Sequence, residues 1–133
     1  MNKIEFYRHS INDEDIKQDV SVLSSIFITT GDVVRDFENK FQTYLNIRNV
    51  IGVTSCTAAL YLSLLAWDIK KGDEMITTPL SLCATTNAIL HADAIPVYVD
   101  VQEYTGNINA ELIESKITKR TRAILPVHLC GLL

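Results

Sequence analysis

The sequence has few cysteines, and none of them forms a closely spaced pair. Its three cysteines, Cys56, Cys83 and Cys130, lie far apart along the 133 residues, and no C-x-x-C motif occurs. This arrangement excludes a disulfide framework, fits no zinc site of the usual spacing, and is typical of a reducing compartment. No other spaced set of metal ligands is present in the sequence. We therefore expect no bound metal.

Basic charge is also scarce. Lysine and arginine number 12 against 16 aspartate and glutamate residues, which gives a formal net charge of −4. Proteins that bind nucleic acid present a basic surface to the phosphates, so nucleic acid is not an expected partner.

No run approaches the roughly 18 consecutive apolar residues of a membrane-spanning helix. The N-terminus, MNKIEFYRHS, lacks the apolar segment of a signal peptide. We expect a cytoplasmic protein without a membrane partner.

The glycine-rich loops of common nucleotide sites are missing as well. The chain has five glycines, and neither G-x-x-x-x-G-K-[ST] nor G-x-G-x-x-G occurs. The first absence excludes a Walker A loop, and the second argues against a dinucleotide site. Apolar residues, in contrast, make up 47% of the chain. That fraction is sufficient for a hydrophobic core in a chain with the length of one ordinary domain.

The first third of the chain has helical periodicity. Apolar residues recur at helical spacing from Ile16 to Phe27, after the capping run NDED. A second apolar stripe, from Val34 to Leu45, follows the break ITTG, and Asp32 is its expected N-cap. We predict an N-terminal helical segment over residues 1–48.

From residue 49 the pattern alternates between strands and helices. Short apolar runs typical of strands are separated by helical segments, which predicts right-handed crossovers and a mostly parallel sheet. The predicted strands are 49–53, 74–79, 94–101 and 122–129, and the predicted helices are 57–69, 82–92 and 110–117. The first of these helices is apolar nearly all round, so we expect it to be buried between layers. Residues 49–133 thus form the predicted α/β region.

The stretch VTSCTAAL, residues 53–60, joins the first predicted strand to the first predicted helix of that region. The first N–H groups of a helix have no partner within the helix, and with the helix dipole they favour an anion. Small residues let an anion approach the backbone closely, and the Ser55 and Thr57 hydroxyls add donors. Two interpretations remain open here. Thr54, Ser55 or Thr57 caps the helix, or the corner binds the phosphate of a ligand.

Several stretches of the sequence occur together in one known family. The corner SCTAAL is followed by GDEMITTP, ATTNAIL, PVYVDV and ITKRTRAILPVHLCG, and the order and spacing closely resemble those of the DegT/DnrJ/EryC1/StrS sugar aminotransferases. The upstream stretch GDVVRDFENKFQTYL is similar to the same family. The resemblance implies part of the large domain of a fold type I pyridoxal-phosphate (PLP) enzyme, with a mostly parallel α/β sheet and flanking helices. It also implies amination of keto groups on nucleotide-linked sugars, with glutamate as the expected amino donor.

The resemblance assigns roles to particular residues. In the family, the residues that match Ser55, Cys56, Thr57 and Ala58 bind the phosphate of PLP, and Cys56 stands where glycine or asparagine is usual. The family places an aromatic ring, stacked on the pyridine of PLP, at the position of Leu82. Leucine can cover a ring by dispersion but lacks the flat π surface. Thr85 and Asn87 match the same motif, and capping or turn roles for both residues remain open.

Three candidates are expected near the substrate or at an interface. Thr30 and Gly31 resemble a site that family dimers place near the partner's active site, which implies a homodimer. His128 ends the last predicted strand, at the sheet edge where α/β proteins bind ligands, and a core or loop role is the alternative.

The family's Schiff-base lysine lies downstream of its P-V-H-L-x-G segment, and no lysine from Lys3 to Lys119 matches that position. The resemblance therefore implies the N-terminal portion of an aminotransferase, without transaminase activity of its own. Two alternatives stay open: a non-catalytic module that binds a phosphorylated ligand or another subunit, and the remnant of a disrupted reading frame.

Overall fold

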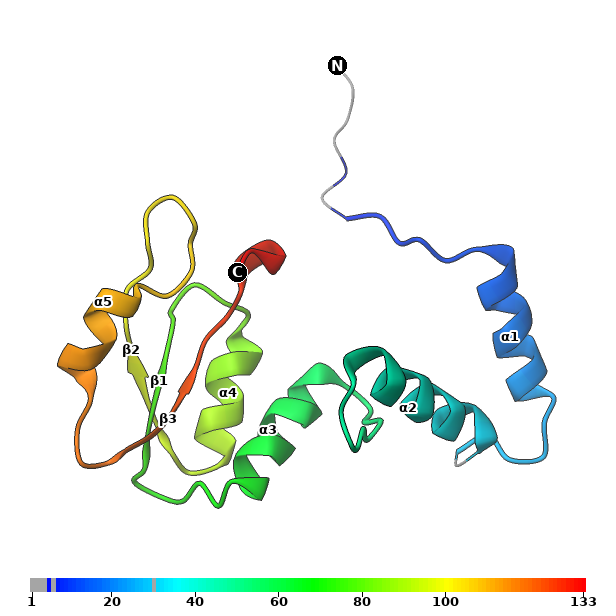
Figure 1. Cartoon of the computed structure of the whole chain (residues 1–133), viewed down its shortest axis with the longest axis horizontal. Helices are drawn as coiled ribbons and strands as arrows, with labels where there is room; N and C mark the ends of the chain where they lie inside the picture. Colours follow the sequence, from blue (N-terminus) through cyan, green and yellow to red (C-terminus); the bar gives the residue numbers. More distant parts are fainter. Residues whose placement is uncertain (1–4, 6, 30) are drawn as a thin grey trace. The chain divides into compact units, whose positions relative to one another are not determined.

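The computed structural model describes residues 5, 7–29 and 31–133 (Figure 1). The chain divides into two compact units, Met1–Gly52 and Val53–Leu133. The first unit holds two helices, and the second holds a parallel sheet with its own helices. Each unit has its own internal contacts.

The first helix, α1 (Asp13–Leu23), begins at a capping box. The Asn12 side chain accepts hydrogen bonds from the backbone N–H groups of Glu14 and Asp15, and the Asp15 carboxylate accepts one from the Asn12 N–H. This reciprocal pattern satisfies donors that the helix itself leaves open. The periodicity predicted a helix as far as Phe27, but α1 ends at Leu23, where the Ser24 hydroxyl donates to a carbonyl of the last turn.

The second helix, α2 (Asp32–Leu45), has Gly31 as its N-cap. The prediction of Asp32 as the N-cap is wrong, because Gly31 occupies that position and Asp32 is the first helical residue. A carboxylate in the first turn still interacts favourably with the helix dipole. The helix ends at Asn46, which adopts a left-handed conformation with φ of 53°.

Residues 49–53 form no strand, so the strand predicted there is wrong. The Gly52 N–H donates to Glu38 Oε1 of α2 at 2.8 Å instead of to a neighbouring strand. A short apolar run does not by itself distinguish a strand from a packed loop, since the same side chains suit both.

The second unit contains a three-stranded parallel sheet in the order β2-β1-β3. Its strands are β1 (Glu74–Thr77), β2 (Ile95–Tyr98) and β3 (Thr121–Leu125). Its helices are α3 (Cys56–Ala66), α4 (Cys83–His91) and the short α5 (Ala110–Ile113), with 3-10 turns η1 (Glu114–Lys116) and η2 (Leu129–Gly131). The α/β class and the parallel sheet are confirmed.

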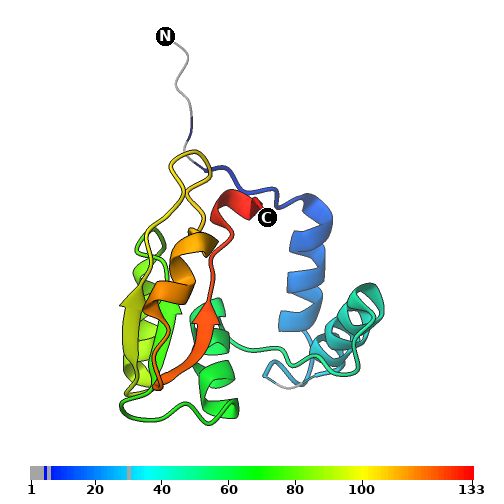
Figure 2. The same cartoon turned by 60° about the vertical axis from the view of Figure 1, so that its left-hand side comes forward.

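Helices cover both faces of this sheet (Figure 1; Figure 2). The crossover from β1 through α4 leads to one side of the central strand, and the crossover from β2 through α5 leads back past it to the other side. Two right-handed crossovers in opposite directions place α4 and α5 on opposite faces. The main core forms where α3 and α4 meet the sheet, and it includes Leu64, Met75 and Ile89.

Helix α3 is only partly buried, which corrects the expectation that it lies between layers. Leu64 is its one fully buried side chain, whereas Leu62 and Leu65 are about half exposed and Trp67 is 62% exposed. Leu60 and Tyr61 pack against the core cluster. The apolar pattern is present on all sides of the helix, but the described residues cover only one side.

Candidate functional site

The candidate site lies at the carboxyl edge of the sheet, where ligands bind in open α/β folds. Helix α3 precedes β1 and packs against α4, and its N-terminal end lies toward the end at which the strands finish (Figure 1). Helix α4 begins just after β1, and η2 follows β3. Because β1 and β3 are parallel neighbours, these segments share one edge.

Ser55 caps α3 and thereby shapes the corner. Its backbone is extended, with φ of −161° and ψ of 158°, and its Oγ accepts a hydrogen bond from the Ala58 N–H at 3.1 Å. The Ser55 carbonyl accepts from the Ala59 N–H at 3.0 Å. The capping interpretation is therefore confirmed for Ser55, and the helix begins at Cys56 instead of Thr57.

The cap leaves two donors open at the corner. The backbone N–H groups of Cys56 and Thr57 have no acceptor among the residues that the structure describes, and both residues are exposed. Open N–H groups at a helix N-terminus attract anions through their partial charge and the helix dipole. Cys56 adopts no left-handed conformation, so the absence of the usual glycine causes no backbone strain. The corner thus fits a phosphate group.

Leu82 stands at the N-terminus of α4 with its side chain 75% exposed. Thr85, one turn further, is buried, and its hydroxyl lies 2.7 Å from the Ser81 hydroxyl. The Thr85 N–H also donates to the Leu82 carbonyl at 3.1 Å. Thr85 therefore stabilises the start of α4, whereas Leu82 is free to contact a ligand. Asn87 is exposed, and its side chain has no partner in the described part of the chain.

His128 lies beyond the end of β3. The strand was expected to run to residue 129, but it ends at Leu125, directly before Pro126. A proline cannot donate to the strand ladder, so the strand stops there. His128 is the exposed N-cap of η2 at the carboxyl edge.

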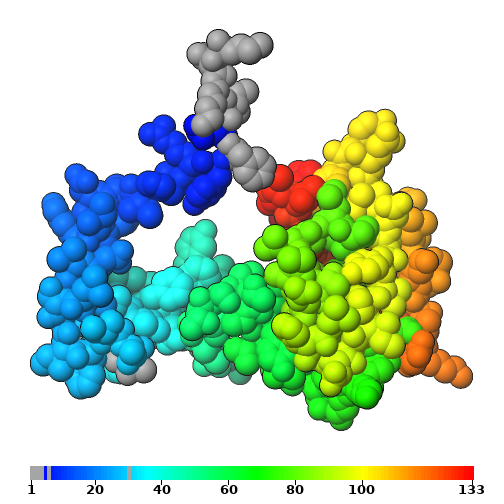
Figure 3. All heavy atoms as spheres, turned by 180° about the vertical axis from the view of Figure 1, so that it is seen from behind, coloured from blue at the N-terminus to red at the C-terminus, as the bar shows by residue number. Residues whose placement is uncertain are grey.

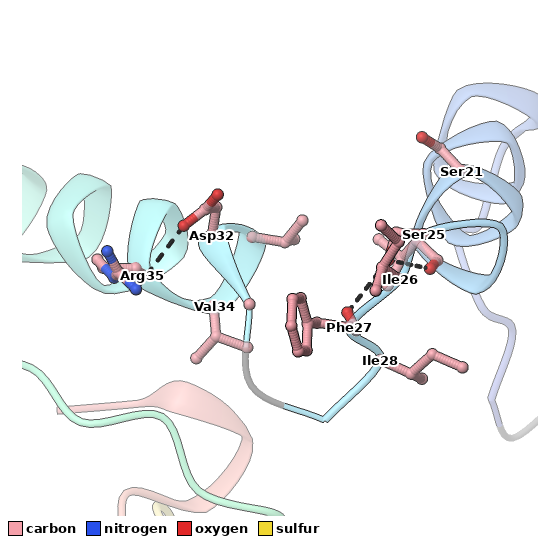
Figure 4. Close-up of a pocket in the computed structure, with 11 residues that line it drawn as sticks. Ser21, Ser25, Ile26, Phe27, Ile28, Asp32, Val34 and Arg35 are labelled. Atoms are coloured by element: carbon pink, nitrogen blue, oxygen red, sulfur yellow. Dashed lines mark hydrogen bonds and ion pairs between the residues drawn. The ribbon is translucent and has the colours of Figure 1, made fainter.

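Gly31 lies beside a hollow within the first unit. The hollow has a volume of about 700 Å³ and is lined by residues of α1, α2 and the segment between them. Its lining is mostly apolar, and Figure 4 shows Phe27 in the middle with Val34 beyond it on α2. Asp32 and Arg35 form an exposed ion pair of 3.7 Å at its rim. Thr30, the other candidate from this segment, lies outside the described residues.

The sequence indicated only a turn at Gly106 and Asn107, which lie at the carboxyl edge. Asn107 bonds through its side chain to the segment after β3, and Gly106 approaches that segment closely. The stretch TGN is a turn signal, but nothing local in it indicates partners more than 20 residues away.

Among the described residues no cluster of three potential metal ligands occurs, and no helix there is long and apolar enough to cross a membrane.

The fold and the site define an α/β protein with a helix N-terminus that leaves two backbone N–H groups open beside a parallel sheet. The family model described as the DegT/DnrJ/EryC1/StrS aminotransferase family matches residues 9–133. The chain belongs to this family, which confirms the resemblance seen in the sequence.

Similar proteins support the same assignment. The chain is 46% identical over 125 residues to the uncharacterized protein MJ1066 of Methanocaldococcus jannaschii. This alignment covers 94% of this chain and 32% of that protein. It is 40% identical over 121 residues to the spore coat polysaccharide biosynthesis protein SpsC of Bacillus subtilis, which covers 91% of this chain and 31% of that protein.

Among solved structures, the PMP form of the putative sugar aminotransferase Spr1654 of Streptococcus pneumoniae matches with a TM-score of 0.93 and 33% identity. The match covers 99% of this chain and 33% of that one. The chain therefore spans about a third of the length of its relatives.

Proposed function

We propose that this chain forms the phosphate-binding portion of a PLP-dependent aminotransferase that acts on nucleotide-linked keto sugars. PLP supplies the electron sink for transamination when it is bound. The residues of this chain bind and orient the cofactor, and the Schiff-base lysine belongs to the part of the enzyme that this chain does not span. On its own, the 133-residue chain therefore binds the cofactor but does not catalyse transamination.

The open corner of α3 carries this proposal. The free N–H groups of Cys56 and Thr57 point out of a helix whose first turn holds no acidic residue. A phosphate dianion there gains two backbone donors, the Thr57 hydroxyl and the helix dipole. Ser55 keeps the corner in shape through its bond to Ala58.

Leu82 has the second role. Its exposed side chain, at the start of α4, covers the face of the cofactor ring by dispersion alone. Asn87 is a weaker candidate for a contact, and Thr85 acts indirectly by fixing the start of α4. Family relatives named as sugar aminotransferase and as spore coat polysaccharide biosynthesis protein support a sugar substrate. Glutamate is the proposed amino donor.

We further propose that residues 1–48 form a separate helical segment, and that residues 49–133 begin the large domain of a homodimer. In that assembly Gly31 and the hollow beside α2 lie near the partner's site. The three free, exposed cysteines suit a cytoplasmic setting. Sedimentation of the full-length enzyme, compared with a Gly31→Lys variant, tests the interface, because a lysine there would have to be accommodated between two subunits.

The test of the function uses the 133-residue chain and pyridoxamine phosphate (PMP), which cannot react with surface lysines as the PLP aldehyde does. Calorimetry compares PMP with pyridoxamine and with inorganic phosphate. We expect PMP to bind, pyridoxamine not to bind, and inorganic phosphate to bind at least about tenfold more weakly than PMP, since only PMP meets both the corner and Leu82.

The exposed apolar side of α3 favours a second candidate, a non-catalytic module that binds a phosphorylated ligand or another subunit. Equal affinity for PMP and inorganic phosphate would support that module, because the ring would then contribute nothing. Binding of neither molecule would contradict the cofactor-binding proposal and leave only a module that binds another subunit.

A further inference from the structure

The segment between β2 and α5 forms a closed hairpin at the carboxyl edge of the sheet. Val101 and Ile108 make an antiparallel bridge. The Gln102 N–H donates to the Asn107 carbonyl at 2.9 Å, which closes the hairpin one step nearer its tip. The Asn107 N–H in turn donates to the Thr105 hydroxyl at 3.2 Å. These bonds fix the backbone of the tip and the direction in which Asn107 projects.

Asn107 uses both ends of its side-chain amide on the segment after β3. Its Oδ1 accepts from the Leu129 N–H at 2.8 Å, and its Nδ2 donates to the Leu132 carbonyl at 2.9 Å. Between these two anchors the chain makes a tight turn in which Cys130 has φ of 54° and Gly131 has φ of 79°. A left-handed conformation is unfavourable for cysteine. The turn therefore depends on the bonds that bracket it.

Gly106, next to Asn107, brings the hairpin tip against two other segments. A Cβ atom at Gly106 would lie 2.5 Å from Leu129 Cδ2 and 3.1 Å from Leu80 Cδ2, and the residue has φ of 69°. The positive φ favours glycine, and a Cβ here would displace the ends of both leucine side chains. Figure 3 shows the C-terminal segment, in red, beside the green segment that follows β1 and the yellow hairpin.

We propose that Gly106 and Asn107 are positioning residues for the ligand site at the carboxyl edge. Leu80 is two residues from Leu82, and Leu129 directly follows His128. By fixing Leu80 and Leu129, the hairpin sets where the ring-covering side chain and the histidine stand relative to the corner of α3. Neither positioning residue contacts the ligand. The proposal rests on the proposed function for the identity of that ligand.

The first test compares two glycine substitutions in the 133-residue chain. Gly106→Ala adds a Cβ that meets Leu129 and Leu80, and Gly72→Ala adds one at φ of 88° with no atom within 4 Å. Both carry the backbone penalty of a left-handed alanine, so the difference between them isolates the contacts. We expect Gly106→Ala to weaken PMP binding about tenfold relative to Gly72→Ala. Equal affinities of the two variants would overturn the proposal.

The second test needs no ligand. Amide hydrogen exchange of Leu129, followed by NMR, is measured in Asn107→Ala and in Asn109→Ala, which removes the cap of α5 without touching the turn. We expect faster exchange at Leu129 only in Asn107→Ala, together with a shift of the His128 ring signals. Unchanged exchange would overturn the proposal even if the wild-type chain bound no PMP, which would count against the proposed function separately. Faster exchange with unchanged PMP affinity would reduce Asn107 to a structural residue and also overturn the proposal.

Discussion

The amino edge of the parallel sheet pairs a buried carboxylate, whereas the corner of α3 leaves two backbone donors open. At the amino edge, the Glu74 carboxylate is buried and is held by the Arg120 guanidinium and the Thr118 hydroxyl. Asp73 at the same edge accepts from the Lys70 N–H at 2.8 Å. At the carboxyl edge, the N–H groups of Cys56 and Thr57 are exposed and have no acceptor in the described part of the chain.

Within this small sheet, the paired groups of the amino edge serve stability, and the open donors of the carboxyl edge can serve ligand binding. A buried charge is tolerated only where it is paired, so the amino edge contributes to the register between β1 and β3. Donors left open to solvent cost little and add no stability, so the carboxyl edge is available for a ligand. Removal of the buried Glu74 carboxylate should therefore change the free energy of unfolding, and removal of an open donor should change ligand affinity.

The largest expected effect is on stability and comes from removing the buried carboxylate at the amino edge. Glu74→Leu leaves Arg120 and Thr118 without their shared acceptor, and we expect a loss of about 2–3 kcal/mol in the free energy of unfolding. Trp67, the single tryptophan, lies in the same unit, so its fluorescence during urea unfolding reports the change. Glu114→Leu, at an exposed position, is the control. A similar loss in both variants would contradict a special role for the buried carboxylate.

A smaller effect is expected at the corner itself. Ser55→Ala removes the acceptor of the Ala58 N–H, and we expect α3 and its unit to lose about 1 kcal/mol of stability. Ser63→Ala, in the same helix, removes a hydroxyl that bonds back to the Ala59 carbonyl, and it should cost less than about 0.5 kcal/mol. Urea unfolding of both variants is the measurement. Equal costs would mean that Ser55 does not act as a cap.

The next effect is a gain in ligand affinity at the carboxyl edge. Leu82→Phe places an aromatic ring where the family has one, and we expect PMP to bind about threefold more tightly, because stacking adds to dispersion. Leu90→Phe, on a half-exposed position of the same helix, should leave the affinity unchanged. Calorimetric titration decides. Weaker binding by Leu82→Phe would place the side chain away from the cofactor ring.

The smallest effect returns to the amino edge. Arg122 faces Asp73 at 3.9 Å with its side chain about half exposed. An exposed pair of this length contributes little, so Arg122→Ala should change the free energy of unfolding by less than about 0.5 kcal/mol. A loss as large as that of Glu74→Leu would show that burial is not what distinguishes the two pairs.

Much of the second unit could be predicted from the sequence. The turn residues around 74–77 and 95–98 predicted strands that the structure confirms, and of the helix predicted at 110–117 α5 covers 110–113. Local signals were sufficient there, because each strand is short and bounded by turn residues. The family assignment followed from several motifs in a fixed order, and the comparison with the family model confirms it.

Other features could not be predicted because their causes are not local. Residues 49–53 have the composition of a strand, but Gly52 bonds to Glu38 of α2 instead. The burial of α3 depends on neighbours that its own sequence does not specify. Asn107 reaches partners 22 and 25 residues away, which no periodicity records. The roles of Ser55–Ala58, Leu82 and Asn87 as ligand contacts stay predictions.

The open N–H groups of α3 are the proposed phosphate donors, and one pair of variants tests this role directly. Cys56→Pro removes the first of these donors, and proline suits this position because it opens the helix and follows an extended Ser55. Cys56→Ala keeps the donor and removes only the thiol. We predict that calorimetry finds PMP bound about tenfold more weakly by Cys56→Pro than by Cys56→Ala, with equal stability of the two chains. Equal affinity in both variants would show that the Cys56 N–H does not bind the phosphate.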